Sequence, residues 1–273
     1  MKGSSVETLI LSDLHLGSEL SRAADALQLL RHARYEQLIL LGDIFADLNF
    51  RRLTSEQWEL LSLVRKLSNP KRGVKVIWVE GNHDYGLSEV MSHLVGVPVY
   101  QRYVWESHGR RNLAMHGHQF DRFLSRNYFL SRIGEGIFHR LQCFEGRSRS
   151  VAQHLDRIST RWLRLTEKVA EGALSYARAG NIDRVFCGHT HVAIERHRDG
   201  VSYYNSGCWV DAQPTYITVG EEGVRIHVYE AGEYERAEHR HSRAQRGRNA
   251  AAAFEVSDEA GLSLFGEYQS VRC

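Results

Sequence analysis

The sequence lacks the features that mark secreted, membrane-spanning and strongly basic proteins. Its 273 residues contain four cysteines, which have neither metal-ligand spacing nor the density of a disulfide scaffold. No apolar run approaches transmembrane length, and residues 1–7 have no apolar core like that of a signal peptide. The formal net charge is only +2, so bulk charge gives no reason to expect a nucleic-acid partner. We therefore expect a cytoplasmic protein with free thiols.

The sequence does contain a regular alternation of strand-like and helical patterns. Helical patterns cover Arg22–Arg34 and Ser55–Leu67, between short runs rich in leucine and β-branched residues, which is typical of βαβ units. The expected strands are Thr8–Leu11, Leu38–Leu41, Val74–Val79, Leu113–Met115, Arg184–Cys187, Ser202–Asn205, Tyr216–Val219 and Val224–Val228. The length and the apolar fraction of 42% suit one large α/β domain with an insertion.

Metal-capable side chains follow five of these strands directly. They are Asp13 and His15, Asp43, Asn82 to Asp84, His116, and His189 with His191. Solvated loop residues could explain any one of these clusters, but they explain all five together poorly. Because open α/β sheets bind ligands beyond the carboxyl ends of their strands, we expect one convergent site.

The residue types in this site favour a pair of divalent cations. Asp13 and His15 are spaced i, i+2, so both side chains leave one face of the chain and can bind the same cation. Asp43 follows a glycine, and its two oxygens can bridge two cations. Because the set mixes carboxylate, amide and imidazole ligands, we expect Mn²⁺, with Fe²⁺ or Zn²⁺ as alternatives, rather than Mg²⁺ or Ca²⁺.

Five short motifs resemble, in this order, the signature of the calcineurin-like metallophosphoesterases. The motifs are Asp13-Leu14-His15, Gly42-Asp43, Gly81-Asn82-His83-Asp84, His116-Gly117-His118 and Gly188-His189-Thr190-His191. The resemblance implies an α/β sandwich with a βαβ-rich core of two sheets flanked by helices, and a helical cap insertion at about 120–180. It also implies a catalytic domain over residues 1–231. Because Arg, His, Glu and Ala dominate the first half of residues 232–273, we expect a charged tail there that is flexible or forms a loosely packed helix.

The resemblance further implies roles for eight side chains in hydrolysis of a phosphoester or pyrophosphate. Asp13, His15 and His191 are expected to hold one metal, Asn82, His116 and His189 the other, and Asp43 to bridge both. The two cations would share a hydroxide that attacks phosphorus in line. His83 is expected to stabilise charge or to protonate the leaving oxygen, so His83 and Asp43 are the catalytic candidates. Asp84 and His118 are expected to orient the ligands.

The segment from about Phe120 to Gly180 resembles the cap of the UDP-2,3-diacylglucosamine pyrophosphohydrolases of lipid A synthesis. Such a cap suggests a lipid-linked nucleotide substrate and peripheral contact with the inner face of the membrane. Arg122, Arg126, Arg149 and Arg157 are the candidate phosphate contacts. An ordinary helical pair with an exposed basic face explains the same pattern equally well.

Two positions depart from that branch, and they leave other functions open. His83 stands where the lipid A enzyme has arginine, and Cys208 replaces an aspartate of the wider group. The main alternative is a phosphodiesterase or phosphatase acting on a soluble nucleotide or another small phosphoester. A scaffold without catalysis is a further alternative, but the intact set of seven ligands disfavours it, because unpaired buried carboxylate and imidazole groups are costly without a cation.

Overall fold

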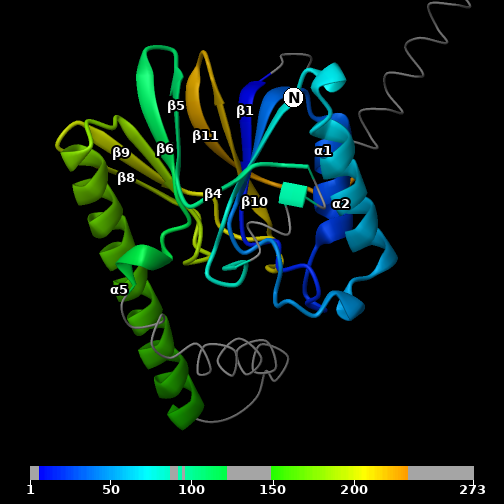
Figure 1. Cartoon of the computed structure of the whole chain (residues 1–273). Helices are drawn as coiled ribbons and strands as arrows, with labels where there is room; N and C mark the ends of the chain where they lie inside the picture. Colours follow the sequence, from blue (N-terminus) through cyan, green and yellow to red (C-terminus); the bar gives the residue numbers. More distant parts are fainter. Residues whose placement is uncertain (1–5, 87–91, 94–95, 122–148, 233–273) are drawn as a thin grey trace, which may run out of the picture. The chain divides into compact units, whose positions relative to one another are not determined.

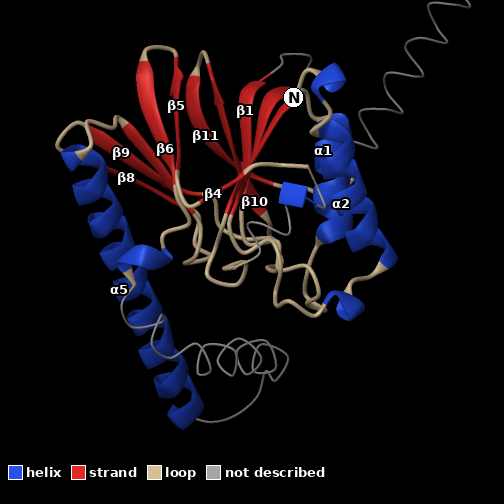
Figure 2. Cartoon of the chain, viewed as in Figure 1, coloured by secondary structure: helices blue, strands red, loops and turns tan. Residues whose placement is uncertain are grey.

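The computed structural model describes residues 6–86, 92–93, 96–121 and 149–232, and for residues 149–161 only the backbone. These residues form two β-sheets packed face to face, with helices on the outer faces (Figures 1 and 2). Contacts divide the chain into two units, Met1–Tyr229 and Glu230–Cys273. Both sheets and the predicted metal site belong to the first unit.

The first sheet has six strands in the order β11-β10-β1-β2-β3-β4. These strands are β1 (Val6–Leu11), β2 (Tyr35–Leu41), β3 (Lys75–Val79), β4 (Val99–Tyr100), β10 (Thr215–Gly220) and β11 (Gly223–Val228). Strands β1 to β4 are parallel, whereas β10 pairs antiparallel with both β1 and β11. Because β1, β2 and β3 are parallel, their carboxyl ends lie at one edge of the sheet.

The second sheet has five strands in the order β5-β6-β7-β9-β8. These strands are β5 (Tyr103–Ser107), β6 (Arg110–Ala114), β7 (Arg184–Cys187), β8 (Ile194–Arg198) and β9 (Val201–Asn205). Strand β7 is parallel to both neighbours, β6 and β9, while the outer strands β5 and β8 are antiparallel. The carboxyl ends of β6 and β7 therefore also share an edge.

The core lies between the two sheets and follows the two-residue period of the strands. Ile10, Ile39 and Ile77 of the first sheet pack with Phe186 and Tyr204 of the second. The intervening residues of β1, β2 and β3 are buried too, on the face that the helices α1 (Ala23–His32) and α2 (Ser55–Leu67) cover (Figure 1). Burial on both faces explains why these strands read as continuous apolar runs.

Local sequence signals fix several element ends. Helix α2 begins at a capping box, in which the Thr54 side chain accepts from the Gln57 backbone N–H and the Gln57 side chain accepts from the Thr54 N–H. Short 3₁₀ turns form η1 (Phe50–Arg52), η2 (Pro70–Arg72) and η3 (His118–Phe120). The left-handed Gly73 ends η2.

The segment that the sequence predicts as a cap divides into two parts. Residues 122–148 lie outside the described residues. The rest forms one long helix, α5 (Arg149–Ala179), whose buried residues Ala170, Ala173 and Ala177 pack against the second sheet. The carboxyl-terminal part of the predicted cap is therefore a flanking helix of the sandwich, because its apolar stripe is buried against β6, β7 and β9.

Strands β4, β5 and β8 were not expected from the sequence. Strand β8 has mainly exposed residues at the edge of its sheet, so it lacks the apolar run by which strands are recognised. Strand β5 alternates buried and exposed residues, but its exposed Val104 interrupts the alternation of apolar and polar residue types in the sequence.

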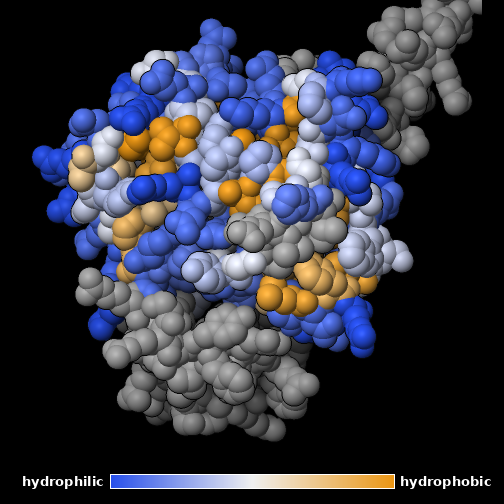
Figure 3. Space-filling view, viewed as in Figure 1, coloured by the Kyte–Doolittle hydropathy of each residue, from blue (hydrophilic) through white to orange (hydrophobic). Residues whose placement is uncertain are grey.

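The face of the molecule drawn in Figure 3 is mainly hydrophilic. In Figure 3 the apolar areas on the face shown are small and separate. Among the described residues, no helix is both long enough and apolar enough to cross a membrane.

Candidate metal centre

Loops gather at one end of the two sheets (Figure 2), and the predicted metal-binding residues lie in loops that follow the strands. From the first sheet come Asp13 and His15 after β1, Asp43 after β2, and Asn82 and His83 after β3. From the second sheet come His116 after β6, and His189 and His191 after β7. Both sheets thus contribute to the same cluster.

Ligand-capable atoms form three groups, in each of which all atoms lie within 4.8 Å of one another. The groups are Asp13, His15 and His191; His15, Asp43 and His83; and Asp43, His116 and His189. The second group shares His15 with the first and Asp43 with the third. The groups therefore adjoin, as a two-cation site requires.

The backbone is strained where these side chains leave it. Five of the candidate ligands have left-handed φ angles: Asp13 (52°), His15 (45°), Asp43 (51°), His189 (68°) and His191 (56°). This conformation costs a non-glycine residue about 1–2 kcal/mol. Such strain persists only where the surrounding structure enforces it, and it is concentrated at functional sites.

Hydrogen bonds between the loops enforce these conformations. The backbone N–H groups of Asp13 and His15 donate to the carbonyls of Gly42 and Asp43, each over 3.0 Å. The Asp84 carboxylate accepts hydrogen bonds from the backbone N–H groups of Ile44 and Phe45, the two residues after Asp43, both over 2.9 Å. Asp84 thus holds the backbone of the loop that carries Asp43.

Two motif glycines allow a close approach that no other residue permits. A Cβ atom on Gly81 would lie 2.1 Å from Asp43 Oδ1, and one on Gly188 would lie 2.3 Å from Asp13 Oδ2. Real Cβ contacts are essentially never so short. Glycine precedes these ligands because a side chain would occupy the position of a carboxylate.

Other contacts fix the direction of the imidazole rings. His116 Nδ1 lies 3.1 Å from the Leu41 carbonyl and His83 Nδ1 lies 2.7 Å from the Ala46 carbonyl, so each Nδ1–H donates outward. The Nε2 atoms then face Asp43 Oδ2, at 3.2 Å from His116 and 3.8 Å from His83. This arrangement leaves a lone pair of each neutral ring directed into the cluster.

The cluster contains buried polar atoms that the protein does not satisfy. Asp13 Oδ1 and His116 Nε2 are buried and make no hydrogen bond of regular geometry with a described residue; they face His191 Nε2 and Asp43 Oδ2, each at 3.2 Å. Asn82 Oδ1 is buried and likewise has no hydrogen-bond partner among the described residues. In addition, the Nε2 atoms of His15 and His191 face each other at 3.2 Å. Unsatisfied buried groups are costly, and these are all electron-pair donors. The donor set therefore fits divalent cations of the kind that accept mixed oxygen and nitrogen ligands.

The surroundings of the cluster shift the pKa values of its histidines in opposite directions. Burial lowers the pKa of His15 to about 3, and the adjacent His191 acts in the same direction. Burial also opposes charge on His116, but Asp43 and Asp13 together outweigh it and raise its pKa to about 9. Although burial raises the pKa of Asp43, attraction to His116 and the other histidines holds it well below the usual value. Without cations, protons on histidines balance the carboxylates.

Three buried or half-buried residues beside the cluster were not singled out from the sequence. Asp121 Oδ2 lies 3.3 Å from His189 Nε2. The Asn205 amide donates to the Gly188 carbonyl over 2.6 Å, and Trp162 contacts the same loop. Asp121 follows the His116-Gly117-His118 motif by three residues, which is the available signal, whereas Asn205 and Trp162 stand in none of the five motifs.

The four predicted phosphate contacts are not described in the structure. Arg122 and Arg126 lie outside the described residues. Arg149 and Arg157 belong to α5, but only their backbone is described.

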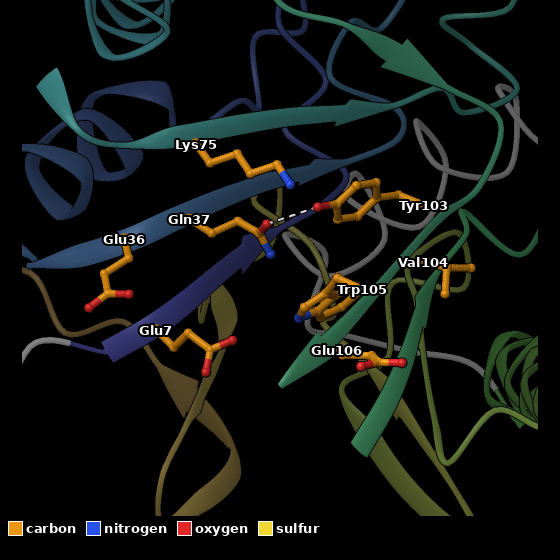
Figure 4. A pocket seen from close by; sticks show the side chains of 8 residues that line it. All are labelled: Glu7, Glu36, Gln37, Lys75, Tyr103, Val104, Trp105 and Glu106. Carbon is orange, nitrogen blue, oxygen red and sulfur yellow. Dashed lines mark hydrogen bonds between the residues drawn. The ribbon is translucent and has the colours of Figure 1, made fainter. Parts of the chain in front are cut away.

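A surface depression of about 600 Å³ lies elsewhere, where β1, β2 and β3 begin (Figure 4). Its lining residues are Glu7, Glu36, Gln37, Lys75, Tyr103, Val104, Trp105 and Glu106. Within it, the Tyr103 hydroxyl donates to Gln37 Oε1 over 3.1 Å. The candidate ligands follow the opposite ends of the same strands, so this depression is separate from the metal centre.

Comparison with known families decides the wider class. The sequence profile of the calcineurin-like phosphoesterases matches residues 7–193, which is more than half of the chain and includes all the candidate ligands. The chain belongs to the calcineurin-like phosphoesterase family. It is accordingly a hydrolase of phosphoesters, and the observed two-sheet α/β sandwich confirms the predicted fold.

Solved structures show distant similarity to this phosphoesterase. An archaeal phosphodiesterase is 17% identical, covers 81% of this chain and 98% of its own, and has a TM-score of 0.45. Vacuolar protein sorting 29 from Cryptosporidium parvum is 14% identical over 82% of this chain and 97% of its own, with a TM-score of 0.43. A predicted phosphoesterase from Streptococcus pneumoniae is 15% identical over 83% and 99%, with a TM-score of 0.37. A search of curated proteins gives no significant match.

Proposed function

We propose that this phosphoesterase uses two divalent cations to hydrolyse a phosphoester or pyrophosphate bond. The cations are held by the loops that follow the strands of both sheets. The observation that carries the proposal is the set of adjoining ligand groups, in which the buried atoms Asp13 Oδ1 and His116 Nε2 face only other members of the cluster among the described residues. Asn82 Oδ1 is also buried without a hydrogen-bond partner in the described part of the chain. When bound, the cations supply an activated water and neutralise the phosphoryl oxygens.

The ligands divide between two cations in this proposal. Asp13, His15 and His191 hold the first, and Asn82, His116 and His189 hold the second. The division is supported by the separate groups around His191 and around His116 and His189. Asp43 shares one group with His15 and another with His116 and His189, and it presents Oδ2 to His116, so we assign it as the bridging carboxylate. We favour Mn²⁺, with Fe²⁺ and Zn²⁺ as alternatives, because of the mixed ligand types.

We assign His83 the role of a proton donor or charge stabiliser rather than that of a ligand, although it shares one group with His15 and Asp43. Its Nδ1–H donates to the Ala46 carbonyl, which fixes the ring and directs Nε2 into the cluster near Asp43. When protonated, Nε2 can donate to a phosphoryl oxygen or transfer its proton to the leaving oxygen.

For the substrate we propose a lipid-linked nucleotide diphosphate such as UDP-2,3-diacylglucosamine, met in the cytoplasm or at the inner face of the membrane. Support comes from the long segment between the His116 and His189 motifs, part of which is α5, and from the arginines Arg122, Arg126, Arg149 and Arg157 within it. A soluble nucleotide or another small phosphoester is the second candidate, since the metal centre itself does not distinguish the two.

A comparison of kcat/KM for two substrates tests this proposal. Remote contacts with an acylated sugar would lower the barrier for its hydrolysis, whereas a plain nucleotide diester would not use them. We expect a higher kcat/KM for UDP-2,3-diacylglucosamine than for the diester, and a loss of this preference when the four arginines are replaced by glutamine. Equal kcat/KM values for both substrates in the unaltered enzyme would exclude the lipid-linked substrate but leave the phosphoesterase chemistry intact.

A further inference from the structure

The apolar stripe of α5 continues beyond the sheet that it covers. At helical spacing it comprises Trp162, Thr166, Val169, Ala170, Ala173, Leu174 and Ala177. The later members of this stripe are buried, and several belong to the core cluster with β6, β7 and β9. Trp162 lies one turn before Thr166, and it contacts the loop that follows β7 at the metal centre.

The contact between Trp162 and this loop is directional. The indole N–H donates to the Thr190 carbonyl over 3.0 Å, and Thr190 separates the two candidate ligands His189 and His191. The indole ring also meets the His191 ring edge-on, with centroids 6.4 Å apart and an angle of 72°. Trp162 therefore touches both the backbone of the loop and one of its ligand side chains.

The loop needs such support, because its conformation is strained. His189 and His191 both have left-handed φ angles. On the sheet side, the Asn205 amide donates to the Gly188 carbonyl and to Thr190 Oγ1, over 2.6 and 3.1 Å. The Thr190 carbonyl points to the other side, toward α5, where the indole N–H satisfies it.

We propose that Trp162 is a positioning residue of the metal centre. Its N–H holds the Thr190 carbonyl, and so keeps His189 and His191 aimed at the cations without binding a cation itself. This inference rests on the proposed metal centre. Groups that orient ligands from outside the coordination shell contribute roughly 10- to 100-fold to metal affinity.

Metal affinity in Trp162→Phe tests the proposal, because phenylalanine keeps an aromatic ring and loses the N–H. Free Mn²⁺ would be measured by electron paramagnetic resonance during titration of the metal-stripped protein. We expect about 10-fold weaker binding of at least one of two ions, with a melting temperature of the metal-free protein close to that of the unaltered chain. Trp58→Phe is the matched control, since Trp58 is 49% exposed on α2, and its Mn²⁺ affinity should be unchanged.

A second variant keeps the test decisive if Trp162→Phe folds poorly. Replacing Trp162 by 3-benzothienylalanine keeps the shape of the side chain and exchanges only the N–H for sulfur, and it should weaken Mn²⁺ binding similarly. Unchanged affinity in the benzothienyl variant, or in a folded Trp162→Phe, would overturn the positioning role. If the unaltered protein bound no Mn²⁺ at all, the proposed metal centre would fail, and the role of Trp162 with it.

Discussion

At the residue scale, the proposed ligand His116 and the proposed non-ligand His83 differ in what surrounds them. His116 is fully buried with Nε2 3.2 Å from Asp43 Oδ2, whereas His83 is half-buried and its Nε2 lies 3.8 Å from the same atom. Both rings donate Nδ1–H to a backbone carbonyl, so the sequence motif alone cannot separate their roles. The longer distance of Nε2 from Asp43 and the partial exposure of the ring favour the proposed role of His83 in catalysis over one in metal binding.

This assignment predicts that His83→Ala keeps metal and loses turnover. The variant should bind as many Mn²⁺ ions as the unaltered enzyme, while its kcat on a chromogenic phosphodiester falls by roughly 10²- to 10⁴-fold, the contribution of a proton donor or charge stabiliser. Metal analysis and steady-state kinetics check both statements. His197→Ala, on the exposed strand β8, is the control and should change neither. A loss of one ion in His83→Ala would make His83 a ligand.

The raised pKa of His116 predicts how the metal-free protein responds to pH. The folded protein holds this proton up to about pH 9, whereas the unfolded chain releases it near pH 6.5. The resulting stabilisation is complete below pH 6.5 and disappears as the pH rises through 9. The pKa of His191 is raised in the same direction, because Cys208 and Asp13 outweigh the opposing effect of burial.

We therefore expect the melting temperature in the presence of a chelator to fall between pH 7 and pH 9. Over the same range the affinity for Mn²⁺ should rise, because a cation must displace these protons. Calorimetric scans and Mn²⁺ titrations at both pH values check the two opposite trends. A metal-free protein that became more stable toward pH 9 would contradict the protonation of His116.

At the element scale, α5 supports the centre at two points. Besides Trp162, it carries Gly172, where a Cβ atom would lie 2.7 Å from the ring of Phe120 in η3. Strand β6 leads through η3 to Asp121, which contacts the His189 ring. The glycine lets η3 lie against the helix, and this close approach fixes Asp121 beside His189.

Gly172→Ala should therefore destabilise the protein, although alanine is the better helix former by about 1 kcal/mol. The new methyl group must displace η3, because Phe120 Cβ and Cγ lie within 3 Å of it. We expect a net loss of about 1–3 kcal/mol, typical of overpacking, measured by urea denaturation. In the control Gly180→Ala the nearest atoms are 3.6 Å away, so that variant should be neutral or slightly more stable. Equal stabilities of the two variants would contradict the close contact with η3.

A helix or strand can be predicted from the sequence when its burial leaves a pattern of apolar residues. The buried strands β1, β2, β3 and β7 are readable because burial on both faces selects continuous apolar runs. The edge strand β8 is polar and is held by pairing with β9, which no local pattern records. The stripe on α5 is readable as an amphipathic helix, but its partner, a sheet rather than a substrate, depends on the tertiary fold.

At the scale of the whole molecule, the proposed metal centre combines residues from two sheets that pack together. The first sheet supplies the carboxylates Asp13 and Asp43, and the second supplies His116 and the histidines after β7. The convergence at strand ends follows from parallel pairing and was predictable from the sequence. The sequence does not predict the strained φ angles, the buried ligand atoms without regular hydrogen bonds, or the contact with Trp162. These features arise from contacts between residues distant in the chain.

The most direct test of the proposed metal centre is a metal count joined to an activity assay. The protein would be stripped with a chelator, reloaded with Mn²⁺, and assayed for bound ions per chain and for hydrolysis of bis(p-nitrophenyl) phosphate, beside Asp43→Ala treated in the same way. We expect two ions per chain, with activity lost on stripping and restored on reloading, and fewer ions with no detectable hydrolysis in Asp43→Ala. Full activity after stripping, or two ions and normal turnover in Asp43→Ala, would contradict a bridged two-cation centre.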